Sequence, residues 1–387
     1  MKDAKMKLLY NSLSMAPPIS GIGRYTTILS DSIAKHPEIE NVKYFDHWNV
    51  LDRKPEFGNS SKGKSIIGML RKLASSPFIA PFATSCLHYQ LAKKINLFHD
   101  FLYHETNYIL MPFNGRTIST FHDLSHINYR NLHPKNRIQY FEKELPKTLR
   151  KSDHFIADSQ FTKDEMVKIL GVKSERVTVI PVGITKQFKP RSLNDLLPIL
   201  DKYRLINKNY ILLVGSIEPR KNIKNFLEAY SQMPESLKKH FMVLHVGPSG
   251  WLNAEIHNKI NQLESKGQFR ALGYLSENEL VSIYAGAYAF AFPSIYEGFG
   301  LPPLEAMASG VPVLASNVSS IPEVVGDCGV LTSPFDVDKM SLDLERILTD
   351  NQLRTLLKRK GPKRAKKFSW GNCVNKTLKV YKQVIGL

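Results

Sequence analysis

Short apolar runs alternate with amphipathic stretches along the first half of the chain. Four of these runs have the length of buried strands, namely LLYNSL, RTISTFHDL, HFIADS and RVTVIPVGI. The first run is followed by the turn-rich SMAPPISGIGRY and then by a helical stretch near TTILSDSIAKH. Strands that alternate with helices in this way predict a parallel sheet with helices on both faces.

A second series of the same kind begins at NYILLVGS. Its apolar runs are YILLVGS, FMVLHVG, FRALGYL, YAFAFPS, VPVLASN and GVLTS, each separated from the next by a helical or turn segment. A connector, FKPRSLNDLLPILDKYRLINKN, lies between the two series. We therefore predict an α/β protein with two Rossmann-like, doubly wound parallel-sheet domains over residues 1–190 and 191–369. A helix over 370–387 follows, which can pack back on the first domain.

The composition agrees with this architecture. A chain of 387 residues exceeds the usual size of one hydrophobic core, and 43% hydrophobic with 23% charged residues is ordinary for a globular protein. Cys86, Cys328 and Cys373 form neither a C-x-x-C pair nor a metal-ligand spacing, which indicates reduced thiols in a cytoplasmic protein. Because no run of about 18 uncharged apolar residues occurs, we expect any membrane contact to be peripheral, on the inner face of the plasma membrane.

The net charge of +18 indicates an anionic partner, such as nucleotide phosphates, acidic lipid, a lipid-linked phosphate or nucleic acid. Residues 62–94 contain six basic and no acidic residues among apolar ones, which is typical of a segment on an anionic membrane surface. Packing on the first domain explains this segment equally well. The basic run over 358–367 is more typical of a solvated helix face. A nucleic-acid-binding protein would interleave aromatic and basic residues, a pattern that this sequence lacks, so we expect no nucleic-acid partner.

The most informative stretch is AFAFPSIYEGFGLPPLEAMASGVPVLAS. A strand ending at Ser294 leads into a loop with Glu297, Gly298 and Gly300, and two prolines suit the first turn of a helix that stops near Gly310. The glycines let a substrate approach the backbone. Their N–H groups and the positive end of the helix dipole favour an anion such as a diphosphate.

Two carboxylates flank this loop. A carboxylate offers two acceptor oxygens and no donor, so Glu305 is suited to both hydroxyls of a ribose and Glu297 to the hydroxyls of a sugar. Taken alone, a solvated loop residue and an acid that favours the helix dipole explain the pair at least as well.

Six motifs, one of them made of two segments, resemble those of the retaining family 4 glycosyltransferases of GT-B fold. EGFGLPPLE, from Glu297 to Glu305, is similar to the E-x7-E motif of that family. The other segments match in the family's order. GIGRYT is similar to its N-terminal glycine loop, TFHDLSH to its histidine motif, and IADSQFTKDE with VIPVGI to its domain-end strands. VGSIEPRKN is similar to its phosphate-binding loop and KFSWGNCVNKTLKVY to its last helix. The resemblance implies GT-B architecture, in which two Rossmann-like domains face each other across a cleft.

The resemblance also implies the catalytic residues. Arg220 and Lys221 are expected to neutralise the leaving diphosphate, in a cleft shared with the two carboxylates. The commoner pattern has an arginine where this chain has Ser216, so we expect Arg220 to supply that charge. His122 is expected near the reacting carbon, where its carbonyl or ring would stabilise positive charge. The implied catalytic residues are His122, Arg220, Lys221 and Glu297.

Residues for binding follow from the same resemblance. Glu305 is expected at the ribose, and the loop amides at the sugar or phosphates. Arg24 is a weaker candidate for the acceptor, as is Asp123, which more simply orders its loop. The implied donor-binding residues are Gly21, Gly23, Ser216, Gly298, Phe299, Gly300, Leu301 and Glu305.

One Asp-x-Asp pair, Asp336 and Asp338, is the only such candidate for a metal bridge. An aspartate before a helical run is commonly an N-cap, so we expect no metal and no other cofactor.

GSIEPRKN and GIGRY most resemble bacterial mannosyltransferase-like members that build O-antigen or capsule chains. GDP-mannose is therefore the first expected donor, with a glycan or lipid-linked oligosaccharide as acceptor and front-side attack that retains stereochemistry. A UDP-sugar or dTDP-rhamnose donor is the alternative, and so is a catalytically idle partner subunit that binds nucleotide sugar.

Overall fold

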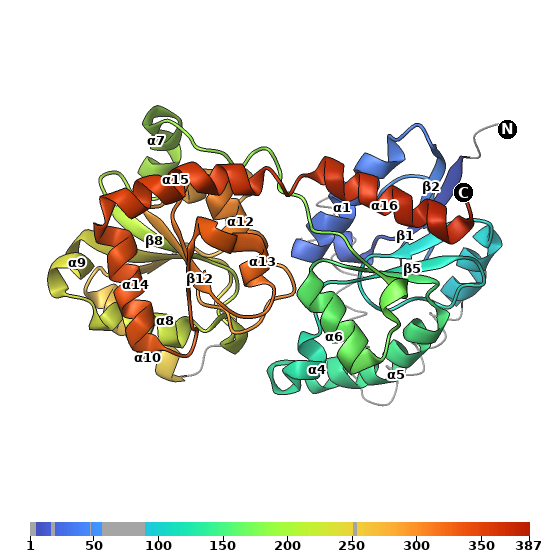
Figure 1. Ribbon diagram of the computed structural model, residues 1–387, viewed down its shortest axis with the longest axis horizontal. Coiled ribbons are helices and arrows are strands. Elements are labelled where there is room, and N and C mark those ends of the chain that lie inside the picture. Colours follow the sequence, from blue (N-terminus) through green and yellow to red (C-terminus); the bar gives the residue numbers. More distant parts are fainter. Residues whose placement is uncertain (1–4, 17–19, 47, 56–89, 251–253) are drawn as a thin grey trace.

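The computed structural model describes residues 5–16, 20–46, 48–55, 90–250 and 254–387. Two α/β units lie side by side in it, each with a central sheet covered by helices (Figure 1). The fold class predicted from the alternating apolar runs is therefore confirmed.

The first sheet has the order β3-β2-β1-β4-β5-β6-β7, and it is parallel except at the edge, where β3 is antiparallel to β2. Its strands among the described residues are β1 (Met6–Asn11), β2 (Ile39–Phe45), β3 (Val50–Leu51), β4 (Leu102–Glu105), β5 (Thr117–Phe121), β6 (His154–Ala157) and β7 (Val177–Val179). The helices of this unit include α1 (Gly21–Ala34), α4 (Ser125–Asn128), α5 (Lys135–Lys151) and α6 (Gln160–Leu170).

The second sheet has the order β10-β9-β8-β11-β12-β13 and is parallel throughout. Its strands are β8 (Asn209–Val214), β9 (Phe241–Val246), β10 (Phe269–Ala271), β11 (Ala289–Phe292), β12 (Val313–Ser316) and β13 (Val330–Thr332). The helices around it are α7 (Leu193–Lys202), α8 (Ile223–Gln232), α9 (Glu235–His240), α10 (Ala254–Ser265), α11 (Glu277–Ala285), α12 (Leu301–Ala308), α13 (Ile321–Val325), α14 (Val337–Thr349) and α15 (Asn351–Ala365).

The central strands are buried on both faces. Every residue of β5, β6, β11 and β12 is buried, because helices cover both sides of each sheet. This is why β11 is a continuous apolar run and β6 and β12 are nearly so, whereas three of the five residues of β5 are Thr or Ser. In each sheet the strand order reverses beside the first strand, between β1 and β4 and between β8 and β11. The carboxyl ends of the strands at these two points are where ligands bind in open α/β sheets.

The last helix, α16 (Trp370–Ile385), returns to the first unit. It lies against α1, and the buried hydroxyl of Tyr381 is 2.7 Å from the hydroxyl of Tyr10 and 2.6 Å from His104 Nδ1. The chain therefore crosses between the units twice. The two crossings touch each other, since Ile184 N donates to Phe368 O at 2.8 Å. Among the helices that the described residues form, none combines the length and apolarity needed to cross a bilayer.

Candidate active site

Glu297 lies between two cations at the carboxyl ends of β8 and β11. Its Oε1 is 2.6 Å from Lys221 Nζ, and its Oε2 is 2.9 Å from an Arg220 guanidinium nitrogen. Arg220 also donates to Tyr296 O at 2.8 Å and pairs with Glu218 at 3.1 Å. Because β8 and β11 are parallel neighbours, the turn after each strand opens at the same edge of the sheet, and this brings residues 76 or 77 positions apart into contact.

This cluster keeps Glu297 ionised. Burial by itself would raise the pKa of the Glu297 carboxyl, but Arg220 and Lys221 outweigh it and lower that pKa to about 2. Burial likewise opposes the charge on Arg220, and Glu297 outweighs it, so the pKa of the guanidinium is raised. A fixed set of two cations and one carboxylate therefore lies at the carboxyl ends of the strands of the second sheet.

Ser320 holds the loop that carries Glu297. Its hydroxyl is 2.8 Å from Glu297 O and 2.9 Å from Phe299 O, and Ser319 Oγ accepts from Glu297 N at 3.0 Å. Gly300 has a φ of 110°, which favours glycine, and it is the residue from which α12 begins. The helix predicted from the prolines and Gly310 is thus confirmed at Leu301–Ala308, and the sequence patterns do not predict the role of Ser320.

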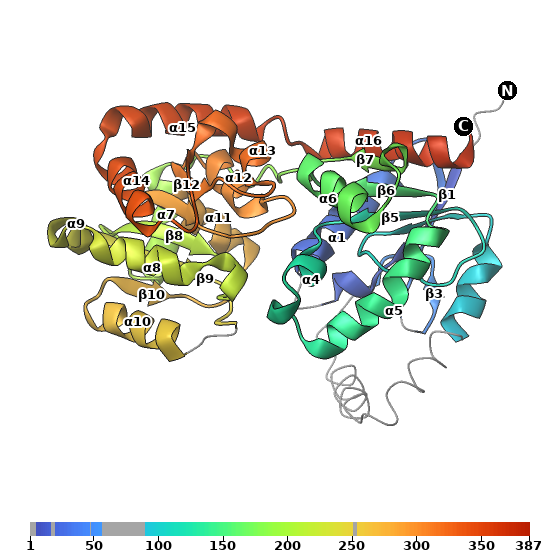
Figure 2. The same cartoon turned by 60° about the horizontal axis from the view of Figure 1, so that its bottom comes forward.

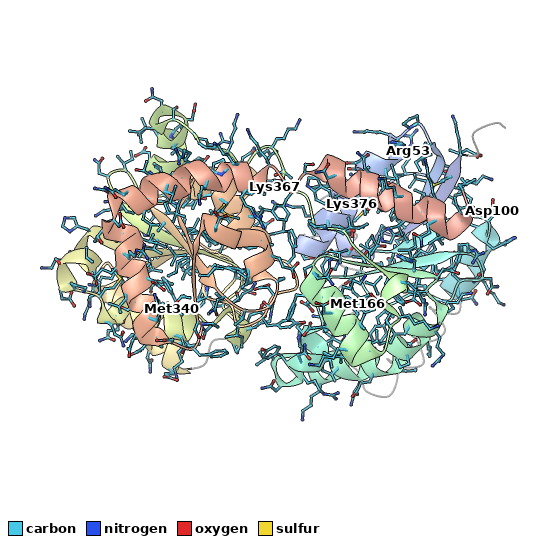
Figure 3. All side chains as sticks on the ribbon, in the orientation of Figure 1. Arg53, Asp100, Met166, Met340, Lys367 and Lys376 are labelled. Atoms are coloured by element: carbon cyan, nitrogen blue, oxygen red, sulfur yellow. The ribbon has the colours of Figure 1, made fainter. Side chains whose placement is uncertain are left out.

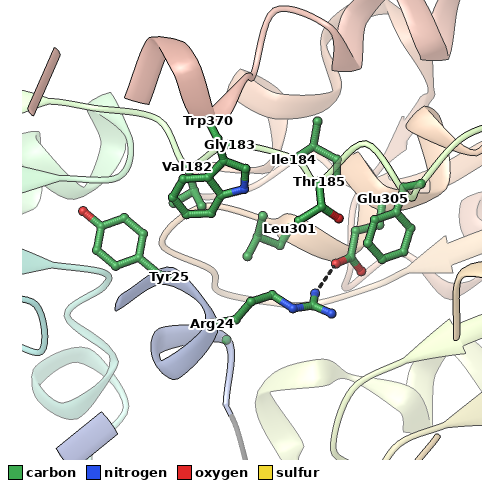
Figure 4. Close-up of a pocket in the computed structure, with 11 residues that line it drawn as sticks. Arg24, Tyr25, Val182, Gly183, Ile184, Thr185, Leu301, Glu305 and Trp370 are labelled. Atoms are coloured by element: carbon green, nitrogen blue, oxygen red, sulfur yellow. Dashed lines mark hydrogen bonds and ion pairs between the residues drawn. The ribbon is translucent and has the colours of Figure 1, made fainter. Parts of the chain in front are cut away.

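Glu305, in α12, faces the first unit. Figure 4 shows its carboxylate bound to the guanidinium of Arg24 in α1, at 2.9 Å, and Arg24 also lies 3.2 Å from Glu277. Burial raises the pKa of the Glu305 carboxyl, and the single cation opposes this only in part, so that pKa is about 7. In this structure the anionic partner of Arg24 is therefore a pair of the protein's own carboxylates.

The expectation that Glu305 and Lys221 share one cleft is wrong for this conformation. Glu305 lines a cavity of about 260 Å³ with Gly21, Arg24 and Leu301, whereas Lys221 lines another of about 240 Å³ with Ser216. The loop between the two carboxylates separates the cavities because it is pressed against the first unit.

Gly298 is where this loop meets the first unit. A Cβ added to it would lie 1.6 Å from His122 O, so only glycine fits there. Its carbonyl accepts from Ser159 Oγ at 2.7 Å and from Thr162 Oγ1 at 3.1 Å. The closed arrangement therefore depends on direct backbone contact between the two units at Gly298.

His122 lies in the loop after β5, and both of its ring nitrogens are occupied. Nδ1 is 2.7 Å from Asp158 Oδ2, and Nε2 is 2.7 Å from Thr106 O. The neighbouring Asp123 accepts from Ser125 N at 2.9 Å, so it orders the start of α4, as its place in the sequence predicts. These contacts leave the carbonyl of His122, and not its ring, facing the loop at Gly298.

Comparison with known proteins identifies the family. Residues 48–188 match the family model described as Glycosyltransferase Family 4, and residues 201–364 match the one described as Glycosyl transferases group 1. The chain is 35% identical to the O-antigen chain mannosyltransferase B of Escherichia coli over 383 residues, which cover 97% of this chain and all of that protein. This chain belongs to the family 4 glycosyltransferases.

Other members of the family share parts of the chain. The serotype-specific mannosyltransferase WbdA of Escherichia coli is 34% identical over 66% of this chain and 32% of its own length. The O-antigen chain mannosyltransferase RfbU of Salmonella typhimurium is 30% identical over 61% of this chain and 60% of its own length.

Solved structures share the GT-B fold of this glycosyltransferase. The lipopolysaccharide-biosynthesis glycosyltransferase WaaG superposes with a TM-score of 0.72 at 17% identity, over 99% of this chain and 100% of that one. The sucrose-phosphate synthase of Thermosynechococcus elongatus gives a TM-score of 0.73 at 19% identity, over 99% and 100%. At these identities the likeness shows the fold alone, and it confirms the predicted architecture.

Among the remaining predicted residues of the glycosyltransferase, Gly21 and Ser216 line the two cavities, whereas Gly23 and Phe299 do not. Gly21 and Gly23 lie in the first turn of α1, where Ser20 Oγ accepts from Gly23 N at 3.2 Å. The space beside Gly21 is open. Phe299 is buried, with its ring 5.8 Å from that of Phe368. Ser216, at the end of β8, lines the cavity of Lys221.

The residues outside this region have structural surroundings. Asp336 is the N-cap of α14, as predicted, and accepts from Lys339 N at 2.9 Å, whereas Asp338 accepts from Gln232 at 2.9 Å. Cys328 and Cys373 are free and buried. Cys86, and the segment 62–94 apart from its last five residues, lie outside the described part of the chain.

Several contacts between the units are not predicted from the sequence. Glu323 of α13 accepts from Gln160 N and Phe161 N at the start of α6, at 2.8 and 2.7 Å. The hydroxyl of Tyr296 accepts from Leu124 N at 2.8 Å. A serine between a strand and a helix is an N-cap signal that could have identified Ser159, but nothing in the sequence pairs these residues across the chain.

Proposed function

We propose that this glycosyltransferase transfers mannose from GDP-mannose to a glycan or lipid-linked oligosaccharide during synthesis of a bacterial surface polysaccharide, with retention of stereochemistry and without a metal. The names of its relatives support mannose and the O-antigen, because a mannosyltransferase of O-antigen chains matches it over its full length. The proposal is carried by one observation, the placement of Glu297 between Arg220 and Lys221.

These three side chains suit the two ends of a nucleotide sugar. Breaking the bond between the anomeric carbon and phosphate leaves negative charge on the diphosphate, and fixed cations stabilise it most where water is excluded. Arg220 and Lys221 supply such cations, with side chains only 16% and 15% exposed. Their partner Glu297 stays ionised and can accept hydrogen bonds from sugar hydroxyls once the phosphate binds the two cations.

Glu305 is the group we assign to the ribose. Its carboxylate lies one turn into α12, a helix whose N-terminus suits an anion such as a diphosphate. A carboxylate accepts two hydroxyl donors, and this is what a ribose offers. Arg24 must release Glu305 before a ribose binds, because the same carboxylate serves both partners.

Of the two routes to retention, the state of these carboxylates favours front-side attack over a double displacement. A double displacement needs a carboxylate nucleophile on the far face of the sugar, and Glu297 is a poor nucleophile because two cations hold it. Front-side attack needs no such group, since the departing phosphate takes the proton of the acceptor hydroxyl. Arg220 and Lys221 provide the positive charge that a divalent cation would otherwise bring to the diphosphate.

A donor panel tests this function. Purified protein is mixed with GDP-mannose, UDP-glucose or dTDP-rhamnose, with and without EDTA, and thermal shift and release of nucleoside diphosphate are measured. We expect the largest shift and the fastest release with GDP-mannose, unchanged by EDTA. Faster turnover of another nucleotide sugar would mean that this sugar, and not GDP-mannose, is the donor. Binding without turnover of any of them would indicate an idle partner subunit.

A basic face supports contact with an anionic lipid surface. Residues 351–387 contain eleven Lys and Arg residues and no Asp or Glu, and α15 and α16 lie in line along one side of both units (Figure 2). Figure 3 shows Lys367 and Lys376 on this side. Seven of these basic residues are exposed and form no ion pair with a described residue: Lys358, Arg359, Lys363, Lys366, Lys367, Lys376 and Lys379.

The chemistry of this face favours lipid head groups. Six of the seven are lysines, which attract anionic surfaces as point charges, at about 1 kcal/mol for each residue near the membrane. Co-sedimentation with vesicles of phosphatidylglycerol and phosphatidylethanolamine tests the contact, with neutral vesicles and high salt as controls. Changing Lys363, Lys367 and Lys376 to Gln should reduce binding at least tenfold, whereas three lysines on the opposite side, changed likewise, should not.

A further inference from the structure

His122 and Asp158 form a buried pair at the carboxyl ends of β5 and β6. The side chains are 12% and 4% exposed, and the distance from His122 Nδ1 to Asp158 Oδ2 is 2.7 Å. The other ring nitrogen, Nε2, is 2.7 Å from Thr106 O in the loop after β4. The imidazole is therefore held at both ends by groups from two neighbouring strands.

Counting protons shows what this geometry requires. Thr106 O is a carbonyl and only accepts, so Nε2 of His122 carries a proton. If Nδ1 carried none, its lone pair would face a carboxylate oxygen, which repels it. A second proton therefore lies between His122 and Asp158, and the pair holds one proton more than a neutral imidazole beside an ionised carboxylate.

The surroundings of the pair agree with this count. Burial opposes the charge of His122, but Asp158 outweighs it and the pKa of the imidazole is raised, while burial raises the pKa of the Asp158 carboxyl. Both directions mean that the pair keeps its proton to higher pH. The other titratable groups facing His122 are Asp123, Glu105, His104, Tyr25 and Tyr108.

Among the described residues, the side chain of Asp158 has no hydrogen-bond partner besides His122. Its Oδ1 is buried and forms no hydrogen bond with any of the described residues, so His122 is the one group that the side chain holds. The ring of Tyr25 packs edge-on against the imidazole with centroids 5.1 Å apart, and that of Tyr108 does so at 5.8 Å. The ring of His122 therefore has one orientation, and Asp158 fixes it.

The main chain of His122 meets the loop of Glu297. A Cβ on Gly298 would lie 1.6 Å from His122 O, which places this carbonyl directly against the loop that we assign to the donor. Because both ring nitrogens are occupied, the imidazole has no free nitrogen with which to act as an acid or base. The carbonyl oxygen is the part of His122 that remains for the reaction.

We propose that Asp158 is a positioning residue of the transfer reaction. By clamping the imidazole of His122 against Thr106 O, it fixes the carbonyl of His122 at the donor loop, where the partial negative charge of that oxygen stabilises the positive charge that develops on the sugar. The catalytic part of this inference rests on the proposed function. The clamp itself does not, because it is a property of the protein without substrate.

Nitrogen NMR of the ring tests the clamp without any donor. In protein labelled with ¹⁵N-histidine, the His122 signals are assigned by their loss in His122→Gln. We expect both ring nitrogens to be protonated at pH 7 in the wild type. Asp158→Asn can keep the geometry with a neutral ring, since its amide donates to Nδ1 while Nε2–H still donates to Thr106 O. A wild-type ring with one unprotonated nitrogen at pH 7 overturns the clamp.

Kinetics test the positioning role. Asp158→Ala should lower kcat on the order of 100-fold with little change in the KM for donor, because the carbonyl is misplaced only for the transition state. Asp158→Asn should recover most of that loss, and it serves as the test if the alanine variant fails to fold. A wild-type kcat in Asp158→Ala, or an Asp158→Asn variant as slow as Asp158→Ala, overturns the proposal. A doubly protonated ring in a protein that turns over no nucleotide sugar overturns the proposed function instead.

Discussion

Glu297 and Glu305 lie at the two ends of one loop and helix, and the surroundings of each hold it in a different state. Both are buried, but Glu297 has two cations of its own domain within 2.9 Å, which lower its pKa to about 2. Glu305 has one cation, which comes from the other unit and is shared with Glu277, and its pKa is about 7. The first carboxylate is therefore a permanent charge, and the second depends on pH and on the position of Arg24.

Removing Glu297 should have the largest effect. We expect Glu297→Ala to lower turnover about 100-fold to 1,000-fold, because the cations lose the group that orients them and the sugar loses its acceptor. Product release at saturating donor is the measurement, with near-UV circular dichroism as a check of folding. A variant that folds and keeps wild-type turnover would remove Glu297 from the reaction.

The pH dependence of donor binding should come from Glu305. Its raised pKa means that the free carboxylate exists mainly above about pH 7, so affinity for GDP-mannose should increase about tenfold between pH 6 and pH 8. Glu297 contributes nothing to this change because it is ionised throughout that range. Calorimetry should show the dependence in the wild type and none in Glu305→Gln, and a dependence that persists in Glu305→Gln must belong to another group.

Arg24 offers a smaller and sharper test. Because Arg24 and a ribose compete for Glu305, Arg24→Ala should tighten binding of GDP-mannose about 5-fold to 10-fold, measured at pH 8.5 so that Glu305 stays ionised without its cation. Arg24→Lys should lie between the two. Weaker binding in the alanine variant would mean that Arg24 itself contacts the nucleotide.

We expect the smallest effect from a substitution of Asp336, a carboxylate outside the site. Asp336 caps α14, so Asp336→Ala should lower the free energy of unfolding by about 1 kcal/mol and leave turnover unchanged. Urea unfolding and the donor assay measure the two quantities. Loss of activity without loss of stability would assign a role in the reaction to the Asp-x-Asp pair.

Much of the fold can be predicted from apolar runs. The ten runs identified in the sequence all contain strands, from β1 to β13, because strands covered by helices are rich in apolar residues. Three strands, β2, β3 and β4, are missed, and β2 and β4 are missed for opposite reasons. IENVKYF is only partly buried and mixes polar with apolar residues, whereas LYHE is fully buried although two of its four residues are polar.

The site is predicted less completely. The sequence motifs indicate Glu297, Arg220 and Lys221, and the structure brings these three side chains together. The sequence cannot indicate that Arg24 binds Glu305, because an ion pair between residues 281 positions apart depends on how the two units meet. Asp158 is missed for a related reason: a carboxylate between a strand and a helix looks like a capping residue, and its partner comes from the neighbouring strand.

The return of α16 to the first unit has a consequence for how this protein is made. The hydroxyl of Tyr381 completes a buried network with Tyr10 and His104, so the earliest strand of the chain finishes its packing only with the latest helix. On a ribosome, the buried hydroxyl of Tyr10 therefore lacks this hydrogen bond until residue 381 has been synthesised. Translation that stops before α16 would thus leave the older half of the molecule without the helix that packs against α1.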